Sequence, residues 1–238
     1  MLQSPELLKK IPLFQAIPDA YLEVLAGKMS ELDVKKGEVL FRKGSTGTAL
    51  YVIQRGAIKI VLPSKIGDEM IVAIFKEGDF LGELALLDLE PRSADAVAIT
   101  PSRLFLLERD DFFQLLKTND AAMRVLLASL SSRIRNTDTL LEDTCFLNIP
   151  ARFAKKLLEL GDTFGREDDG DLEISLKITQ KDLAGMIGAS RESVNKELRQ
   201  LRERGIINVT ARAIRIVDPV RLKRRTEQKS GPLRWQIP

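Results

Sequence analysis

The stretch ITQKDLAGMIGASRESVNKELRQL, residues 178–201, has the pattern of two helices joined by a tight turn. Thr179 is followed three residues later by Asp182, and this pairing forms a capping box that predicts the start of the first helix. Gly188 suits the turn because glycine adopts a left-handed conformation without strain. Ser190 is a favourable N-cap for the second helix. The stretch therefore predicts a helix-turn-helix.

The second helix of such a motif enters the major groove of DNA. We expect Arg191 and Lys196 to donate to guanine O6 and N7, and Glu192 to accept from the N4 amino group of cytosine. An ordinary helical hairpin with a charged surface is the alternative. The residues expected to contact double-stranded DNA are Thr179, Ser190, Arg191, Glu192, Ser193, Asn195, Lys196, Arg199 and Arg212.

On the C-terminal side, IINVTARAIRIV, residues 206–217, predicts a hairpin that would serve as a wing, with Arg212 and Arg215 near DNA phosphates. Residues 221–238 are basic, contain proline and show no periodicity, so we expect a mobile tail.

On the N-terminal side, NIPARFAKKLLELG, residues 148–161, predicts a helix with Pro150 in its first turn and Gly161 at its end. The acidic segment GREDDGD, residues 165–171, is expected to be a loop.

Charge is distributed unevenly. Residues 1–146 contain 18 Lys and Arg against 21 Asp and Glu, whereas residues 147–238 contain 19 against 13. This asymmetry favours a basic C-terminal domain that meets a polyanion, although a solvated basic surface would give the same count.

A heptad pattern precedes this basic half. Apolar residues and threonines spaced alternately by four and three residues form a seam on one helix: Met123, Leu127, Leu130, Ile134, Thr137, Leu141 and Thr144. Such a seam predicts a parallel homodimer, and the alternative is a helix packed against its own domain. The polar sequence RNTDT, residues 135–139, interrupts the apolar character of the helix.

Residues 32–107 contain short runs rich in β-branched residues, such as ALYVIQRGAIKIVL, separated by glycines. This pattern predicts an antiparallel sandwich or roll. Residues 5–30 are expected to form short helices that break near Pro12 and Pro18.

The predicted fold class is α+β, with a jelly-roll-like β-roll, a long dimerisation helix and a winged helix-turn-helix. The expected parts are residues 1–109 for the roll, 110–146 for the dimerisation helix, 147–220 for the DNA-binding domain and 221–238 for the tail.

Composition excludes several classes of protein. The chain has one cysteine, Cys145, and no histidine, so we expect no metal, haem or iron–sulfur cluster. The usual general base is missing, so we expect no enzyme. No run approaches the ~20 apolar residues of a membrane span, and the N-terminus lacks a signal pattern. We therefore expect a cytoplasmic protein with no membrane contact.

The stretch GELALLDLEPRSA, residues 82–94, brings a carboxylate, Glu83, close to Arg92 and Ser93. An arginine fork and a hydroxyl are donors that suit a phosphate, and a carboxylate is a hydrogen-bond acceptor. The alternative is a Glu83–Arg92 salt bridge that stabilises an empty loop.

The chain resembles the CRP/FNR family of bacterial transcription regulators in the order of three features. These are the roll with residues 82–94, called the cassette below, then the seam helix, and then the motif GASRESVNKEL. The resemblance covers about residues 10–217. It implies a nucleotide-gated dimer that binds a palindrome with TGTGA-like half-sites and meets RNA polymerase. It also leaves open a differently gated regulator, or a cyclic-nucleotide module that regulates an enzyme.

The resemblance further implies cyclic AMP (cAMP) as the favoured ligand. Glu83 would accept from the ribose hydroxyl, Arg92 and Ser93 would hold the cyclic phosphate, and Gly82 would admit the ligand closely. Arg133 would lie near that carboxylate, and Thr137 would meet the adenine edge. The expected ligand-binding residues are Gly82, Glu83, Leu84, Arg92, Ser93, Ala94, Arg133, Thr137 and Asp138. Asp138 stands where a family member has serine, and its carboxylate could accept from the amino group of adenine or from guanine.

Overall fold

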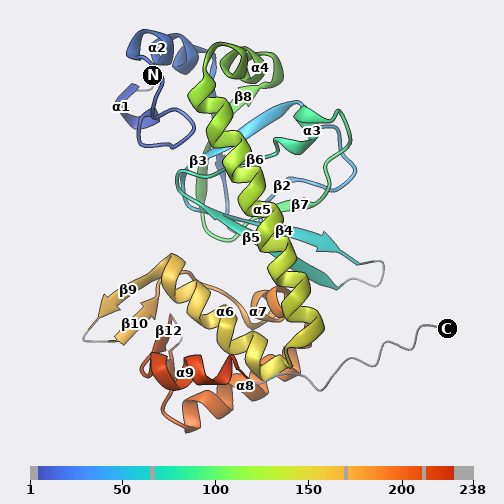
Figure 1. Ribbon diagram of the computed structural model, residues 1–238, viewed down its shortest axis with the longest axis vertical. Coiled ribbons are helices and arrows are strands. Elements are labelled where there is room, and N and C mark those ends of the chain that lie inside the picture. The colour runs from blue at the N-terminus through green and yellow to red at the C-terminus, as the bar shows by residue number, and fades with distance from the viewer. Residues whose placement is uncertain (1–4, 65–67, 169–170, 211–212, 228–238) are drawn as a thin grey trace, which may run out of the picture. The chain divides into compact units, whose positions relative to one another are not determined.

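Two compact units make up the chain. The first contains residues 1–67 and 71–136, and the second contains residues 68–70 and 137–238. The computed structural model describes residues 5–64, 68–168, 171–210 and 213–227 (Figure 1). Each unit has its own hydrophobic core, so each is described by itself.

The first unit is built on two four-stranded sheets, which confirms the predicted β-roll. The strand orders are β1-β8-β3-β6 and β2-β7-β4-β5. Their bounds are Ser30–Val34 (β1), Val39–Phe41 (β2), Ala49–Arg55 (β3), Ala57–Pro63 (β4), Glu69–Lys76 (β5), Phe80–Leu81 (β6), Asp95–Ala98 (β7) and Ser102–Glu108 (β8). The described registers are antiparallel, and inward residues such as Ile53, Ile58 and Leu104 form the core of the roll.

A second core lies beneath the helices that flank the roll: α1 (Pro5–Leu8), α2 (Asp19–Lys28), α4 (Arg109–Thr118) and the start of α5 (Asp120–Phe146). Leu22, Phe105, Phe112 and Leu126 are buried there. The expected short helices near the N-terminus are therefore confirmed, and they are held by apolar burial.

Residues 110–146 form two helices, not the single helix expected. Asn119, between α4 and α5, is extended, with φ −141° and ψ 99°. Its side-chain oxygen accepts a hydrogen bond from the Ala122 amide at 2.9 Å, as an N-cap does. The side chains of Phe112 and Leu115 then anchor α4 in the core of the first unit.

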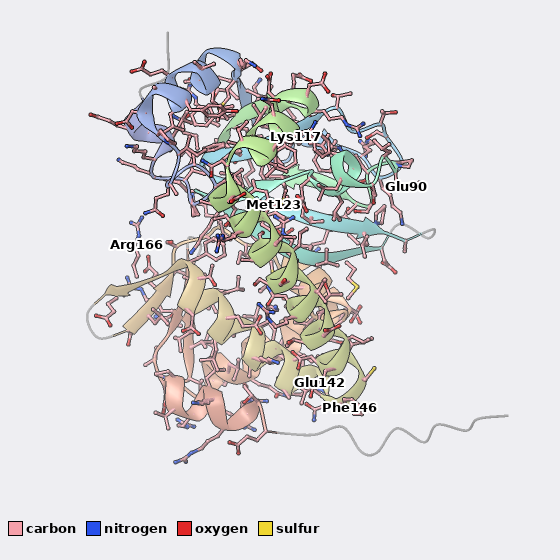
Figure 2. All side chains as sticks on the ribbon, turned by 45° about the horizontal axis from the view of Figure 1, so that its top comes forward. Glu90, Lys117, Met123, Glu142, Phe146 and Arg166 are labelled. Atoms are coloured by element: carbon pink, nitrogen blue, oxygen red, sulfur yellow. The ribbon has the colours of Figure 1, made fainter. Side chains whose placement is uncertain are left out.

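The α5 helix is continuous over 27 residues (Figure 1). Ala122 and Leu126 face the core, and Leu130 packs partly against it. The other seam residues are exposed, including Leu127 at 54% and Ile134 at 63%. Figure 2 labels Met123 in the first turn and Phe146 at the last residue, and both side chains are exposed. The seam thus presents an apolar stripe that its own domain does not bury.

Besides residues 137–146 of α5, the described part of the second unit contains four helices and a four-stranded sheet of order β11-β12-β10-β9. The bounds are Ile149–Phe164 (α6), Gly165–Asp168 (β9), Asp171–Ile174 (β10), Gln180–Ile187 (α7), Arg191–Glu203 (α8), Ile207–Val209 (β11), Ile214–Ile216 (β12) and Pro219–Arg225 (α9). The β11–β12 pair is the predicted wing hairpin.

Two expectations for this unit are wrong. The α6 helix continues past Gly161 to Phe164, because Gly161 serves packing and not termination: a Cβ there would lie 2.7 Å from Leu172 Cδ2. The acidic segment 165–171, expected as a loop, contains β9 and the start of β10. The β10 strand pairs with β12, which is distant in the sequence, so the local pattern does not reveal this pairing.

The expected tail begins with a helix. Residues 219–225 form α9, whose N-cap Asp218 accepts from the Arg221 amide at 2.8 Å. Leu222 is fully buried, so this helix belongs to the domain. The rest of the tail beyond residue 227 lies outside the described residues. Among the described helices, none is both long and apolar enough to cross a membrane.

Candidate nucleotide-binding and DNA-binding sites

Arg92 lies inside the β-roll at the end of the cassette and is 4% exposed. Its backbone is held by the segment before β3, since the Gly44 amide donates to the Arg92 carbonyl and the Arg92 amide donates to the Ser45 carbonyl, both at 2.8 Å. Its guanidinium donates to the carbonyls of Gly82 at 2.5 Å and Ala49 at 2.9 Å. Burial lowers the pKa of Arg92 below its usual value, yet an arginine stays charged.

Glu83 begins the short helix α3 (Leu84–Leu87), and its side chain is 1% exposed. Its carboxylate pairs with the Arg133 guanidinium from α5, which also donates to the Phe80 carbonyl. The predicted proximity of Arg133 to this carboxylate is therefore confirmed. The alternative, a Glu83–Arg92 salt bridge, is not the arrangement found.

Glu83 and Arg92 each have a buried polar atom without a hydrogen-bond partner. Within the described ranges, no donor reaches Glu83 Oε2 and no acceptor reaches Arg92 Nε. A buried polar atom without a partner is costly, so it is usually satisfied by a ligand or water. A ligand that combines a hydroxyl with an anionic oxygen has the chemistry to satisfy both atoms, and a ribose cyclic phosphate is such a ligand.

Aromatic rings flank both arginines, which the sequence analysis missed. The Arg92 guanidinium carbon lies 4.4 Å from the centroid of the Phe41 ring and 5.6 Å from that of Tyr51. The guanidinium carbon of Arg133 lies 4.4 Å from the Phe75 centroid. Cation–π contacts of this kind hold a guanidinium in place. Phe41, Tyr51 and Phe75 are distant in the sequence from the arginines that they contact, so no local pattern relates them.

Two glycines make room for Arg92. A Cβ on Gly82, whose φ is +89°, would lie 2.4 Å from Arg92 Nη1. The place that a side chain at Gly82 would occupy is therefore filled by Arg92, and the expected close approach of the ligand to Gly82 stays a prediction. A Cβ on Gly47 would lie 2.6 Å from Ala85 Cβ and 2.9 Å from Arg92 Cζ. Gly47 is a second residue that the sequence analysis missed.

The other expected ligand residues differ in exposure. Ala94 is buried, whereas Leu84 and Ser93 are exposed. Thr137 and Asp138 are exposed on α5, and their contact with the base stays a prediction.

The loop between α3 and Arg92 contains a strained residue. Leu89 has φ +67°, a conformation that non-glycine residues rarely adopt, and its side chain is exposed. Asp88 stabilises the loop by accepting from the Glu90 amide at 3.0 Å, and Glu90 is labelled in Figure 2.

The helix-turn-helix has the predicted local geometry. Thr179 and Asp182 form the capping box of α7, Gly188 is left-handed with φ 59°, and Ser190 caps α8. The Thr179 hydroxyl is engaged with Asp182, and that of Ser190 lies 3.0 Å from that of Ser193. These hydroxyls therefore define the starts of both helices.

The outer face of α8 carries the predicted reading residues. Arg191, Glu192, Lys196 and Arg199 are exposed, and Asn195 is half-buried. Val194, Leu198 and Leu201 are buried on the opposite face, as predicted. The face can therefore donate and accept hydrogen bonds at base edges.

One of the two wing arginines lies in the described residues. Arg215 donates from Nε to Glu173 Oε2 at 2.7 Å across the β10–β12 pair, so it stabilises the sheet, and its place near DNA phosphates stays a prediction. Arg212 lies outside the described residues. Among those that are described, no cluster of three or more His, Cys, Asp or Glu residues is suited to a metal ion.

Comparison with known proteins identifies the family. Residues 31–119 match the cyclic nucleotide-binding domain family, and residues 151–225 match the Crp-like helix-turn-helix domain family. Over 220 residues the chain is 33% identical to the CRP-like cAMP-activated global transcriptional regulator of Mycobacterium tuberculosis, covering 92% of this chain and 98% of that protein. The chain belongs to the CRP/FNR family.

Other CRP/FNR proteins support this assignment. The chain is 30% identical to the global nitrogen regulator of Nostoc sp. over 80% of this chain and 86% of that protein. A CRP/FNR-family transcriptional regulator of Thermus thermophilus has a similar structure, with a TM-score of 0.68, 26% identity and coverage of 84% of this chain and 100% of that one. As a CRP/FNR member, the protein is a DNA-binding transcription regulator and not an enzyme.

Proposed function

We propose that a cyclic nucleotide gates DNA binding by this CRP/FNR regulator, and that cAMP is the ligand. The observation that carries the proposal is the pair of buried, unpaired atoms, Glu83 Oε2 and Arg92 Nε, at one site. The name of the Mycobacterium tuberculosis relative, which describes it as cAMP-activated, supports the same ligand.

In this proposal each cassette residue contacts a different part of the ligand. Glu83 accepts from the ribose hydroxyl, and Arg92 donates to the cyclic phosphate together with Ser93. Leu84 and Ala94 complete the cassette, and Thr137 and Asp138 contact the base. Arg133 on α5 already pairs with Glu83. A ligand bound to Glu83 would therefore act on α5 through the Glu83–Arg133 pair.

The proposed regulator is a cytoplasmic homodimer whose seam helices pair in parallel. Its expected parts remain the roll, the dimerisation region and the DNA-binding domain, with boundaries near residues 109 and 146. The ligand would favour one register of the paired helices and so re-aim the recognition helices, which is a population shift. The target is a palindrome with TGTGA-like half-sites, and RNA polymerase is the proposed further partner.

A second candidate is a regulator of the same family with other gating or none. Its support is that Glu83 and Arg92 already have protein partners, and that the Nostoc relative is named a nitrogen regulator.

Calorimetric titration with cAMP, cyclic GMP and cyclic di-GMP separates the two candidates. Tight binding of cAMP, together with an increase in DNA affinity, supports the first. Absence of heat with all three nucleotides at millimolar concentration overturns nucleotide gating and leaves the second.

A further inference from the structure

A buried ion pair joins the recognition helix α8 to the C-terminal helix α9. Glu197 lies on the inner face of α8, among Val194, Leu198 and Leu201. Its carboxylate accepts from Arg225 Nη2 at 3.2 Å, and the two side chains are only 7% and 11% exposed. A charged pair is an unusual choice for the inner face of a helix, where apolar residues normally pack.

A second contact joins the same two helices. Arg221 Nη1 donates to the carbonyl of Arg204, the C-cap of α8, at 3.2 Å. Glu197 and Arg204 are seven residues apart, which is two helical turns or about 10 Å along one face. Contacts at two levels of one face restrain both the rotation of α8 about its axis and its position along that axis.

The α9 helix is itself firmly held. Asp218 caps its first turn, Leu222 is fully buried, and the helix packs mainly against α6. The arginines of α9 therefore extend from a fixed support to the recognition helix.

This pair is a poor device for stability alone. Within the described part of the chain, Arg225 Nε and Nη1 are buried without an acceptor. Replacing a buried ion pair by well-packed apolar residues is often neutral or stabilising, whereas an ion pair fixes geometry because its hydrogen bonds are directional.

We propose that α9 is a positioning element for DNA reading, and that Arg225, acting through Glu197, sets the orientation of the recognition helix. The inference rests on the DNA-binding function of the family and is independent of nucleotide gating. A rotation of ~30° would move a side-chain tip ~6 Å from the helix axis by about 3 Å. That displacement equals the length of a hydrogen bond, so Arg191 and Lys196 would lose their base partners.

The test compares Arg225→Met with Arg224→Met, an exposed cation on the same helix. Hydrogen exchange of the α8 amides and affinity for a DNA site selected by the wild-type protein are measured, with random DNA as reference. We expect Arg225→Met to raise exchange at residues 197–204 at least tenfold, with α7 unchanged. We also expect affinity for the selected site to fall at least tenfold while affinity for random DNA stays within twofold. Arg224→Met should leave exchange and the selected-to-random ratio unchanged.

The double variant Glu197→Leu/Arg225→Met distinguishes a role of the ion pair in positioning α8 from a role in packing. It also replaces Arg225→Met in the test if that single variant does not fold. A positioning role predicts that the double variant regains the wild-type melting temperature but not the preference for the selected site. Wild-type preference in either variant, or unchanged α8 exchange in Arg225→Met, overturns the inference. A wild-type protein that selects no sequence would contradict the palindrome proposal, and the exchange data would still decide the positioning role.

Discussion

Arg92 has two roles at the scale of a single residue, because it supports the roll and faces the proposed ligand. Replacing it with leucine removes the donors of the Gly82 and Ala49 carbonyls, so we expect the free energy of unfolding to fall by about 1–3 kcal/mol. Affinity for cAMP should fall at least tenfold, because the cyclic phosphate loses its charged partner. Melting temperatures with and without cAMP test both effects.

Arg103→Leu is the matched control, because this exposed arginine pairs with Asp33 on the surface of the roll. It should bind cAMP normally. If the melting temperature of the wild-type protein does not change at millimolar cAMP, the hypothesis of cAMP gating is wrong.

The other single-residue prediction concerns base reading. Arg191 is exposed in the first turn of α8, so Arg191→Ala should leave stability unchanged. We expect it to weaken binding to the selected site by about 1–3 kcal/mol and to relax the choice at one guanine. Competition assays with single-base variants of the site measure this. Equal weakening on every sequence would instead assign Arg191 to the phosphates.

At the scale of elements, local signals were sufficient for the helix-turn-helix, but the caps Asn119 and Asp218, which start α5 and α9, were not recognised from the sequence. The start of α7, the left-handed Gly188 and the start of α8 were all predicted from neighbouring residues. The sequence did not reveal α9 or the β9–β10 hairpin, because both depend on partners distant in the chain. For the same reason Glu83 and Arg133 were related only by family resemblance, while Gly47 and Phe41 were missed.

The seam of α5 gives the prediction at this scale. Leu127 and Ile134 are exposed in the single chain, whereas Leu130 packs against the core of its own domain. Leu127→Asp/Ile134→Asp should therefore separate the proposed dimer without unfolding the roll, and Leu130 is a poorer choice. Sedimentation at micromolar concentration checks the result. The control is Ser132→Asp, at an exposed residue on the opposite face of the helix, which should remain dimeric. If Leu127→Asp/Ile134→Asp also remains dimeric, the seam is not the dimer interface.

At the scale of the whole molecule, a two-fold dimer that reads DNA requires a two-fold site. Selection from random DNA should return a palindrome with TGTGA-like half-sites whose centres lie one helical turn apart, roughly 34 Å. The variant Leu127→Asp/Ile134→Asp should lose the preference for the palindrome, because a monomer has one recognition helix and can contact only one half-site. Recovery of single, unpaired half-sites by the wild-type protein would refute the dimeric docking arrangement.

The left-handed conformation of Leu89 bears on protein engineering. A leucine in this conformation costs about 1–2 kcal/mol, whereas asparagine adopts it more readily. Leu89→Asn should therefore raise the melting temperature by about 2–4 °C, which scanning calorimetry can detect. A screen for heat-resistant variants should recover this substitution early. If asparagine instead lowers the melting temperature, the exposed leucine side chain makes a stabilising contact that offsets its backbone strain, and heat resistance must be sought elsewhere.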